Sequence, residues 1–343
     1  MHLSDFDYEL PERLIAQEPL EYRADSRMLV VDRTAATFRD DRFTNFPEHL
    51  RAGDVLVLNN TKVFPARLFG RSETGAAVEI FLIRETGEML WEALARPARR
   101  LKPGKRIIFG DDLSGETISK QDDGKVTVKF FPDGDLNEML ARLGKTPLPP
   151  YIKRTPDDID TDRERYQTVY AKSRGAIAAP TAGLHFTDDV LSRVQARGVT
   201  LAEVTLHVGY GTFEPVRVED LNEHRVMPER FEINAETAGV LNSAKMSGRR
   251  IIAVGTTTTR ALETIVSKHG EFAAEGGYAD LTITPGYRFK AIDGLLTNFH
   301  LPQSSLLILV STFGGRELII KAYEHAVASE YRFYSYGDCM LIL

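Results

Sequence analysis

The chain has 343 residues, of which 43% are hydrophobic and 27% are charged, and its formal net charge is −6. This length suits two domains or one large domain with an insertion, and the negative charge argues against a protein that binds nucleic acid by charge alone. The single cysteine, Cys339, excludes a disulfide framework and a cysteine-based zinc site.

The N-terminus lacks a basic segment followed by an apolar stretch, which argues against a secretory signal. The apolar runs, such as residues 306–310, are too short to span a bilayer. We therefore expect a cytoplasmic protein that does not enter a membrane, and we take a monomer as the default.

The first 65 residues predict the start of an α/β domain. Residues 28–31 and 55–58 have the apolar character of strands, and the second of these runs ends in Asn59 and Asn60. Polar groups at the end of a buried strand lie at the sheet edge where α/β proteins bind ligands, so both asparagines are candidate substrate-binding residues.

Residues 66–148 have a different pattern. Short alternating or apolar runs are separated by turn-forming sequences such as Gly110-Asp111-Asp112. Such spacing predicts a small β-barrel or sandwich. We therefore predict an inserted β-barrel domain at residues 66–148, within an α/β domain formed by residues 1–65 and 149–343.

A basic run without any acidic residue lies in this predicted barrel. It consists of Arg96, Arg99, Arg100, Lys102, Lys105 and Arg106. The functional interpretation is a surface that contacts phosphate groups, and the alternative is a solvated loop.

The stretch from residue 166 to 186 (YQTVYAKSRGAIAAPTAGLHF) is rich in glycine and other small residues, which allow the backbone to approach a ligand closely. Thr187 is suited to cap a helix over residues 187–197, which places Thr181 and His185 at the turn before that helix. Such turns often carry sites in α/β proteins. The alternative is a tight structural turn with a half-buried histidine.

The remaining chain alternates between predicted strands and helices. We predict strands at residues 199–207, 231–233, 250–254, 281–283, 295–297 and 340–343, and helices at residues 235–246, 260–269 and 317–329. Residues 306–311 fit either a strand or a helix.

The segment Gly255-Thr256-Thr257-Thr258-Thr259-Arg260 lies between a predicted strand and a predicted helix. A helix N-terminus offers free N–H groups, and hydroxyls add further donors, so Thr256, Thr257 and Arg260 are candidates to bind an anion or a nucleoside. The segment matches neither a Walker A loop nor the dinucleotide fingerprint. The alternative is a helix cap with spare threonines.

Three histidines, His185, His207 and His300, lie at predicted element ends beside small or polar residues. They are candidates for proton transfer in one pocket. A metal site is the competing hypothesis, but no HExxH motif or short His-x-His pair supports it. The carboxylate most suited to act as a base is Glu214, and other polar candidates near predicted loops are Asn298, Tyr336 and Asp338.

Seven long blocks resemble the S-adenosylmethionine:tRNA ribosyltransferase-isomerase family of queuosine biosynthesis. They are LVLNNTKVFPARLFG (56–70), PLPPYIKR (147–154), the 166–186 stretch, TLHVGYGTF (205–213), AVGTTTTRALE (253–263), LLTNFHLPQSSLLILVSTF (295–313) and YRFYSYGDCMLIL (331–343). The resemblance covers nearly the whole chain in order.

This resemblance implies a Rossmann-like α/β domain interrupted by a small β-barrel. It also implies that the ribosyl group of S-adenosylmethionine is transferred to 7-aminomethyl-7-deazaguanine at the wobble position of tRNA. The ribose is rearranged there to give epoxyqueuosine, and adenine and methionine leave. The implied partners are tRNA and S-adenosylmethionine as co-substrate, with no metal or other cofactor.

The reaction assigns expected roles to the candidates. A base must remove a C5′ proton, for which we consider His185, His207, Glu214 and His300. The segment from Thr256 to Arg260 is expected to hold a polar end of S-adenosylmethionine, with Tyr336 and Asp338 closing the pocket. The anticodon arm is expected on the basic run from Arg96 to Arg106 or on residues 145–174.

Two positions depart from the family pattern. Met227 stands where relatives often have a second histidine after His224, which puts a catalytic role at that position in doubt, and Cys339 replaces a small residue. An RNA methyltransferase and a non-enzymatic RNA-binding protein remain alternatives. A methyltransferase would release S-adenosylhomocysteine, and an RNA-binding module would release no product.

Overall fold

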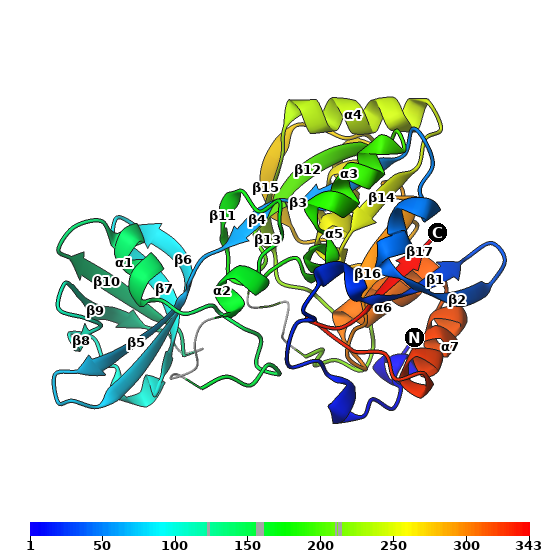
Figure 1. Cartoon of the computed structure of the whole chain (residues 1–343). Helices are drawn as coiled ribbons and strands as arrows, with labels where there is room; N and C mark the ends of the chain where they lie inside the picture. The colour runs from blue at the N-terminus through cyan, green and yellow to red at the C-terminus, as the bar shows by residue number, and fades with distance from the viewer. Residues whose placement is uncertain (122–123, 156–160, 210, 212–214) are drawn as a thin grey trace.

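The computed structural model describes residues 1–121, 124–155, 161–209, 211 and 215–343. A large mixed sheet flanked by helices forms one part of the molecule, and a closed barrel that extends to one side forms the other (Figure 1). This arrangement confirms the predicted fold class, an α/β domain interrupted by a β-barrel.

The large sheet is built from strands that come from both ends of the chain. Its strands are β1 (Arg27–Asp32), β2 (Thr37–Arg42), β3 (Val55–Asn59), β12 (Thr200–Leu206), β13 (Glu229–Ile233), β14 (Ile251–Val254), β15 (Glu275–Ala279), β16 (Gly294–Asn298) and β17 (Cys339–Ile342). Their order is β15-β13-β12-β3-β14-β16-β17-β1-β2. The four central strands from β12 to β16 run parallel, and antiparallel pairings extend the sheet on both sides. Hence the Rossmann-like character is confined to the centre of the sheet.

Helices cover both faces of this sheet. The helices are α3 (Asp188–Ala196), α4 (Ala235–Met246), α5 (Thr256–His269), α6 (Ser305–Gly314) and α7 (Arg316–Ala328), together with the 3₁₀ turns η1 (Leu3–Phe6), η2 (Glu12–Leu14), η3 (Arg23–Asp25), η4 (Phe43–His49) and η6 (Thr181–His185). The short helix α2 (Asp162–Arg165) lies between the barrel and this sheet (Figure 1). Successive side chains of a strand point to opposite faces. In β3, Val55 and Val57 therefore pack in the core beneath α4 to α7, whereas Leu56 and Leu58 pack against η4 and α3.

The barrel closes in the order β10-β7-β6-β5-β8-β9. Its elements are β5 (Arg67–Ser72), β6 (Ala77–Gly87), β7 (Leu90–Arg96), the turn η5 (Ala98–Arg100), β8 (Arg106–Ile108), β9 (Leu113–Lys120), β10 (Val126–Pro132) and α1 (Leu136–Leu143). Alternating residues such as Val126, Val128 and Phe130 fill its core. The predicted domain boundaries at residues 66 and 148 stay a proposal.

A small parallel sheet lies where the chain passes between the two parts. It pairs β4 (Thr61–Val63) with β11 (Ser173–Ala176). Figure 1 shows these strands between the barrel and the large sheet.

Two element predictions need correction. Residues 281–283 form no strand; the edge strand lies earlier, at β15. The helix predicted at residues 260–269 begins at Thr256, so all four threonines lie in its first turn. The ambiguous residues 306–311 belong to helix α6, because the Ser304 side chain caps it by accepting a hydrogen bond from the Leu307 N–H. Among the described helices, none is long and apolar enough to cross a membrane.

Candidate active site

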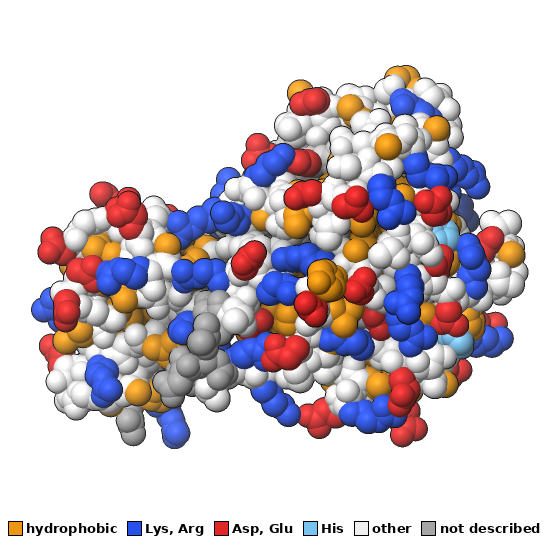
Figure 2. Space-filling model, viewed as in Figure 1, with side chains coloured by type: hydrophobic (Ala, Val, Ile, Leu, Met, Phe, Trp, Pro, Cys, Tyr) orange, Lys and Arg blue, Asp and Glu red, His pale blue; other side chains and the backbone are white. Residues whose placement is uncertain are grey.

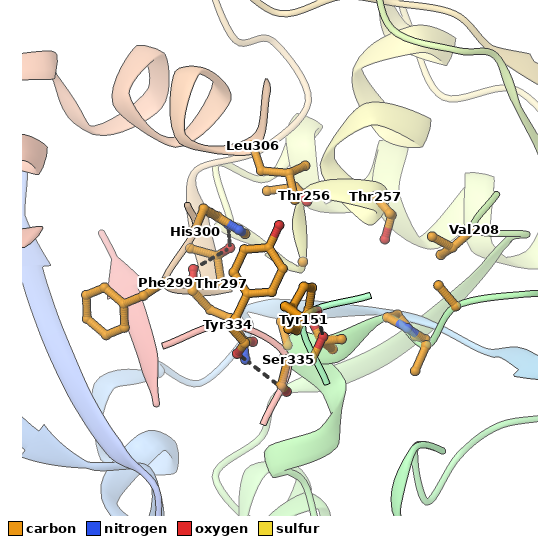
Figure 3. A pocket seen from close by; sticks show the side chains of 17 residues that line it. Tyr151, Val208, Thr256, Thr257, Thr297, Phe299, His300, Leu306, Tyr334 and Ser335 are labelled. Carbon is orange, nitrogen blue, oxygen red and sulfur yellow. Dashed lines mark hydrogen bonds between the residues drawn. The ribbon is translucent and has the colours of Figure 1, made fainter. Parts of the chain in front are cut away.

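A narrow pocket of about 50 Å³ lies at the carboxyl ends of the central strands β14 and β16. It is lined by Tyr151, residues 178–182, Val208, residues 255–257, residues 297–300, Leu306, Tyr334 and Ser335 (Figure 3). Ligands of open α/β sheets bind at this edge. The structure therefore brings Thr181, Thr256, Thr257, Asn298 and His300 together from the predicted set.

The N-terminus of α5 forms one side of the pocket. Gly255 connects β14 to α5 with φ +93°, a backbone conformation that favours glycine. The hydroxyls of Thr258 and Thr259 are bonded to the Val254 and Gly255 carbonyls. Within the described residues the hydroxyls of Thr256 and Thr257 have no hydrogen-bond partner, and Figure 3 shows both side chains at the pocket. These hydroxyls and the free N–H groups of the first turn are suited to hold an anion.

His300 lies on the same pocket and is neutral at physiological pH. Its Nε2 is 2.8 Å from the Thr297 hydroxyl, and burial lowers the pKa of the imidazole from its ordinary value to about 3. Such a weakly basic group is better suited to hold a substrate by hydrogen bonding than to remove a proton.

His185 lies behind the pocket and reaches it through Asn298. Its Nδ1 is 2.8 Å from the Ser26 hydroxyl, and its Nε2 is 3.4 Å from Oδ1 of Asn298, whose amide donates to the Tyr334 carbonyl. Burial lowers the pKa of His185 to about 4, so it is neutral at pH 7. This geometry makes His185 a positioning residue for Asn298.

Two aromatic residues that the sequence patterns did not indicate form another wall of the pocket. The rings of Tyr151 and Tyr334 meet edge to face with centroids 3.9 Å apart, and the Tyr151 hydroxyl bonds the Ser335 hydroxyl. Tyr151 belongs to the PLPPYIKR connector from the barrel, which the resemblance had included. Tyr334 has φ +75°, which no local motif signals.

His207 lies on a second, larger cavity between the barrel and the sheet. This cavity has a volume of about 960 Å³, and Val208 lines both spaces. The Nδ1 of His207 is 2.8 Å from the Thr61 hydroxyl, and burial, followed by the charge of Arg230, lowers its pKa. No partner of its Nε2 is found in the described chain. His207 therefore combines a neutral imidazole, a fixed orientation and access to open space.

Three predicted binding residues have structural partners. Asn59 bonds the backbone of Leu206 through both its amide nitrogen and its oxygen, and Asn60 bonds Glu203 and Thr205. The Arg260 guanidinium is buried in an ion pair with Glu229, 2.6 Å away. None of these three lines the narrow pocket.

The two C-terminal candidates also lie outside the narrow pocket. Tyr336 donates to Asp162, at 2.5 Å. Asp338 accepts hydrogen bonds from the Arg27 and Arg332 N–H groups, and burial raises its pKa. Both residues therefore join distant chain segments, and their predicted role in closing the pocket stays a prediction.

The basic run forms an exposed surface of the barrel around η5. Arg96, Arg99, Lys102, Lys105 and Arg106 are exposed, and none of them forms an ion pair with another described residue. The Arg100 side chain and Glu214 lie outside the described residues. No group of three or more potential metal ligands is found in the part of the chain that the structure describes.

Comparisons with known proteins agree along the whole chain. A model of the queuosine biosynthesis protein family matches residues 3–342. A protein named S-adenosylmethionine:tRNA ribosyltransferase-isomerase from Staphylococcus saprophyticus is 50% identical, and one of the same name from Syntrophotalea carbinolica is 49% identical, each alignment covering 100% of both chains. The crystal structure of S-adenosylmethionine tRNA ribosyltransferase from Thermotoga maritima is 37% identical with a TM-score of 0.57, covering 99% of this chain and 100% of the other.

Proposed function

The chain belongs to the S-adenosylmethionine:tRNA ribosyltransferase-isomerase family of queuosine biosynthesis proteins, and we propose that it carries out the family's reaction where the narrow pocket meets the interdomain cavity. The reaction transfers the ribosyl group of S-adenosylmethionine to 7-aminomethyl-7-deazaguanine at the tRNA wobble position. The rearranged product is epoxyqueuosine, and adenine and methionine are released. The single observation that carries this placement is that Val208 lines both spaces.

The narrow pocket holds one polar end of S-adenosylmethionine. A space of about 50 Å³ is far too small for the whole molecule, so the rest extends past Val208 into the larger cavity. The free hydroxyls of Thr256 and Thr257 and the first-turn N–H groups of α5 bind the methionine carboxylate. His300 and Asn298 add neutral hydrogen-bonding groups, which hold a polar substrate without introducing a charge.

His207 is the base that removes the C5′ proton. The adjacent sulfonium makes this proton acidic, and a neutral imidazole with a free Nε2 can accept it. The Thr61 hydroxyl, 2.8 Å from Nδ1, fixes the orientation of the ring, so Nε2 is available to a group in the cavity. The transfer leaves the imidazole protonated, and Glu232, whose charge raises the pKa of His207, stabilises that form.

The anticodon arm approaches from the side of the barrel. The exposed cations from Arg96 to Arg106 contact its phosphates. A nucleotide enters the open cavity, where it meets the part of S-adenosylmethionine that extends past Val208 from the narrow pocket. Co-substrate and RNA thus bind at adjoining sites and meet at His207.

A product assay tests the function. The protein is mixed with S-adenosylmethionine and a tRNA that carries 7-aminomethyl-7-deazaguanine, and free adenine, free methionine and the mass of the tRNA are measured. Equal amounts of both products and a ribosyl-derived mass gain, with the modified tRNA only, are expected. Release of S-adenosylhomocysteine would instead identify a methyltransferase, and no product from folded protein would exclude the transfer reaction.

A further inference from the structure

Three neighbouring side chains form a row across the edge of the large sheet. In the antiparallel ladder of β13 and β15, Arg230 lies directly opposite Tyr278. The His207 N–H donates to the Arg230 carbonyl, which continues the row to the end of β12. Residues directly opposite in such a ladder have Cβ atoms about 4.5–5.5 Å apart. All three side chains line the interdomain cavity of about 960 Å³.

The end of this row is an exposed aromatic ring. Tyr278 is 61% exposed although it lies in a strand, and it lines a cavity instead of packing in a core. Its neighbour Arg230 is also exposed, and its guanidinium forms no ion pair with any other described residue. An aromatic face beside a free guanidinium is the combination that binds an unstacked base together with its phosphate.

The charges of the cavity match a cationic base on an anionic backbone. Arg174 lies on the barrel-facing side, with its guanidinium 5.5 Å from the centre of the Phe64 ring. The carboxylates of Glu85 and Asp280 line the same cavity, and neither is ion-paired to a residue within the described ranges. The aminomethyl group of the substrate base is a primary amine, which is protonated at neutral pH, so these carboxylates complement it.

We propose that Tyr278 and Arg230 form the platform that holds an unstacked anticodon nucleotide next to His207, with Tyr278 stacking on a base and Arg230 contacting a phosphate. This proposal rests on the proposed function, because it takes a tRNA anticodon loop as the occupant. It assigns RNA recognition to the sheet edge in addition to the basic run on the barrel.

The test is the affinity for an anticodon stem-loop that carries 7-aminomethyl-7-deazaguanine, measured by fluorescence anisotropy with the full-length protein. Tyr278→Ala should raise Kd roughly 5- to 150-fold, the effect of losing one stacked base, and Tyr278→Phe should retain wild-type affinity. Arg230→Gln should weaken binding and reduce the slope of log Kd against log salt by about 0.7, because one phosphate contact is lost.

The matched control is Tyr22→Ala, which removes a tyrosine that is 66% exposed but does not line the cavity. Affinity for S-adenosylmethionine should stay within about twofold of wild type in all four variants. An unchanged Kd in Tyr278→Ala, or an equal loss in Tyr22→Ala, overturns the platform. If the wild-type protein yields adenine in the product assay while Tyr278→Ala binds RNA normally, only this inference fails. If the wild-type protein yields no product, the proposed function fails, and the comparison of Kd values still decides whether the platform exists.

Discussion

At the scale of single residues, the assignment of His207 as base makes the sharpest prediction. His207→Ala should lower kcat by roughly two to four orders of magnitude, because a positioned general base contributes about that much. The KM for S-adenosylmethionine should change little, because the groups assigned to bind its carboxylate, Thr256 and Thr257, line the narrow pocket and His207 does not. Single-turnover kinetics measure the loss, and His269→Ala, which removes a surface hydrogen bond with Glu275, is the control. Near-normal turnover would remove His207 from the mechanism.

The threonines of α5 allow a matched comparison at one helix terminus. Thr256→Val removes a hydroxyl that faces the pocket, so the KM for S-adenosylmethionine should rise roughly 10- to 100-fold, as expected for a hydrogen bond to a charged group. Thr258→Val removes a hydroxyl that is bonded to the Val254 carbonyl, 2.6 Å away, and should leave KM unchanged. Equal effects of the two substitutions would contradict binding by Thr256.

The buried His185 predicts how stability depends on pH. Its pKa of about 4 in the folded protein lies below its ordinary value near 6.5, so the unfolded chain binds the proton more readily between these values. The free energy of unfolding should therefore fall as pH drops from about 6.5 to about 4, by up to about 1.4 kcal/mol per pH unit for this group. His185→Asn can keep a hydrogen bond to Ser26. Its free energy of unfolding, measured with urea at several pH values, should fall less steeply with decreasing pH than that of the wild type. Identical pH dependence in the two proteins would show that His185 does not contribute.

At the scale of elements, Gly175 sets the approach of β11 to the site. It has φ +153°, and a Cβ there would lie 2.7 Å from the His207 ring. Gly175→Ala should therefore lower stability by roughly 1–3 kcal/mol and lower turnover by displacing the imidazole.

A double-mutant cycle separates the two consequences of this substitution. In the His207→Ala variant the steric conflict is relieved, so Gly175→Ala should lower the free energy of unfolding by less than it does in the wild type. Urea unfolding measures the four proteins of the cycle. An equal cost in both backgrounds would mean that backbone strain alone accounts for the loss.

Elements with local signals could be predicted from the sequence. Helix α4 begins and ends where expected, because Asn234 caps it by accepting the Thr237 N–H. By contrast, β9 combines polar and apolar residues without a clear period, and its strand state depends on pairing with β8 and β10. The pattern of residues within one segment does not show which other strands it pairs with.

The same limit applies to the site. Thr256 begins helix α5 and His300 follows β16, and both were indicated by local sequence. Tyr151 and Tyr334 meet only through the tertiary fold, 183 residues apart in the chain, and the Arg230–Tyr278 pair depends on strand register. Arg260 was also indicated by its local sequence, but nothing in that sequence indicated that its guanidinium would be buried in an ion pair with Glu229.

At the scale of the whole molecule, the charge of the barrel face matters more than the net charge of the chain. Figure 2 shows Lys and Arg side chains spread over both parts of the visible face, although the formal net charge is −6. A phosphate-binding surface requires only a local excess of cations. The unpaired cations around η5 provide such an excess on the barrel.

Charge reversal on this surface tests whether the barrel binds RNA. The double variant Arg99→Glu/Lys105→Glu should raise the KM for tRNA by an order of magnitude or more and make the salt dependence less steep, because phosphate contacts are lost and repulsion is added. The KM for S-adenosylmethionine should not change, since its pocket lies in the other part of the molecule. Lys321→Glu, at an exposed position of α7 on the opposite side from the barrel (Figure 1), is the matched control. If the double variant keeps both the wild-type KM for tRNA and its salt dependence, the anticodon arm does not use this face. The Tyr278–Arg230 platform would then have to act with the other expected surface, residues 145–174.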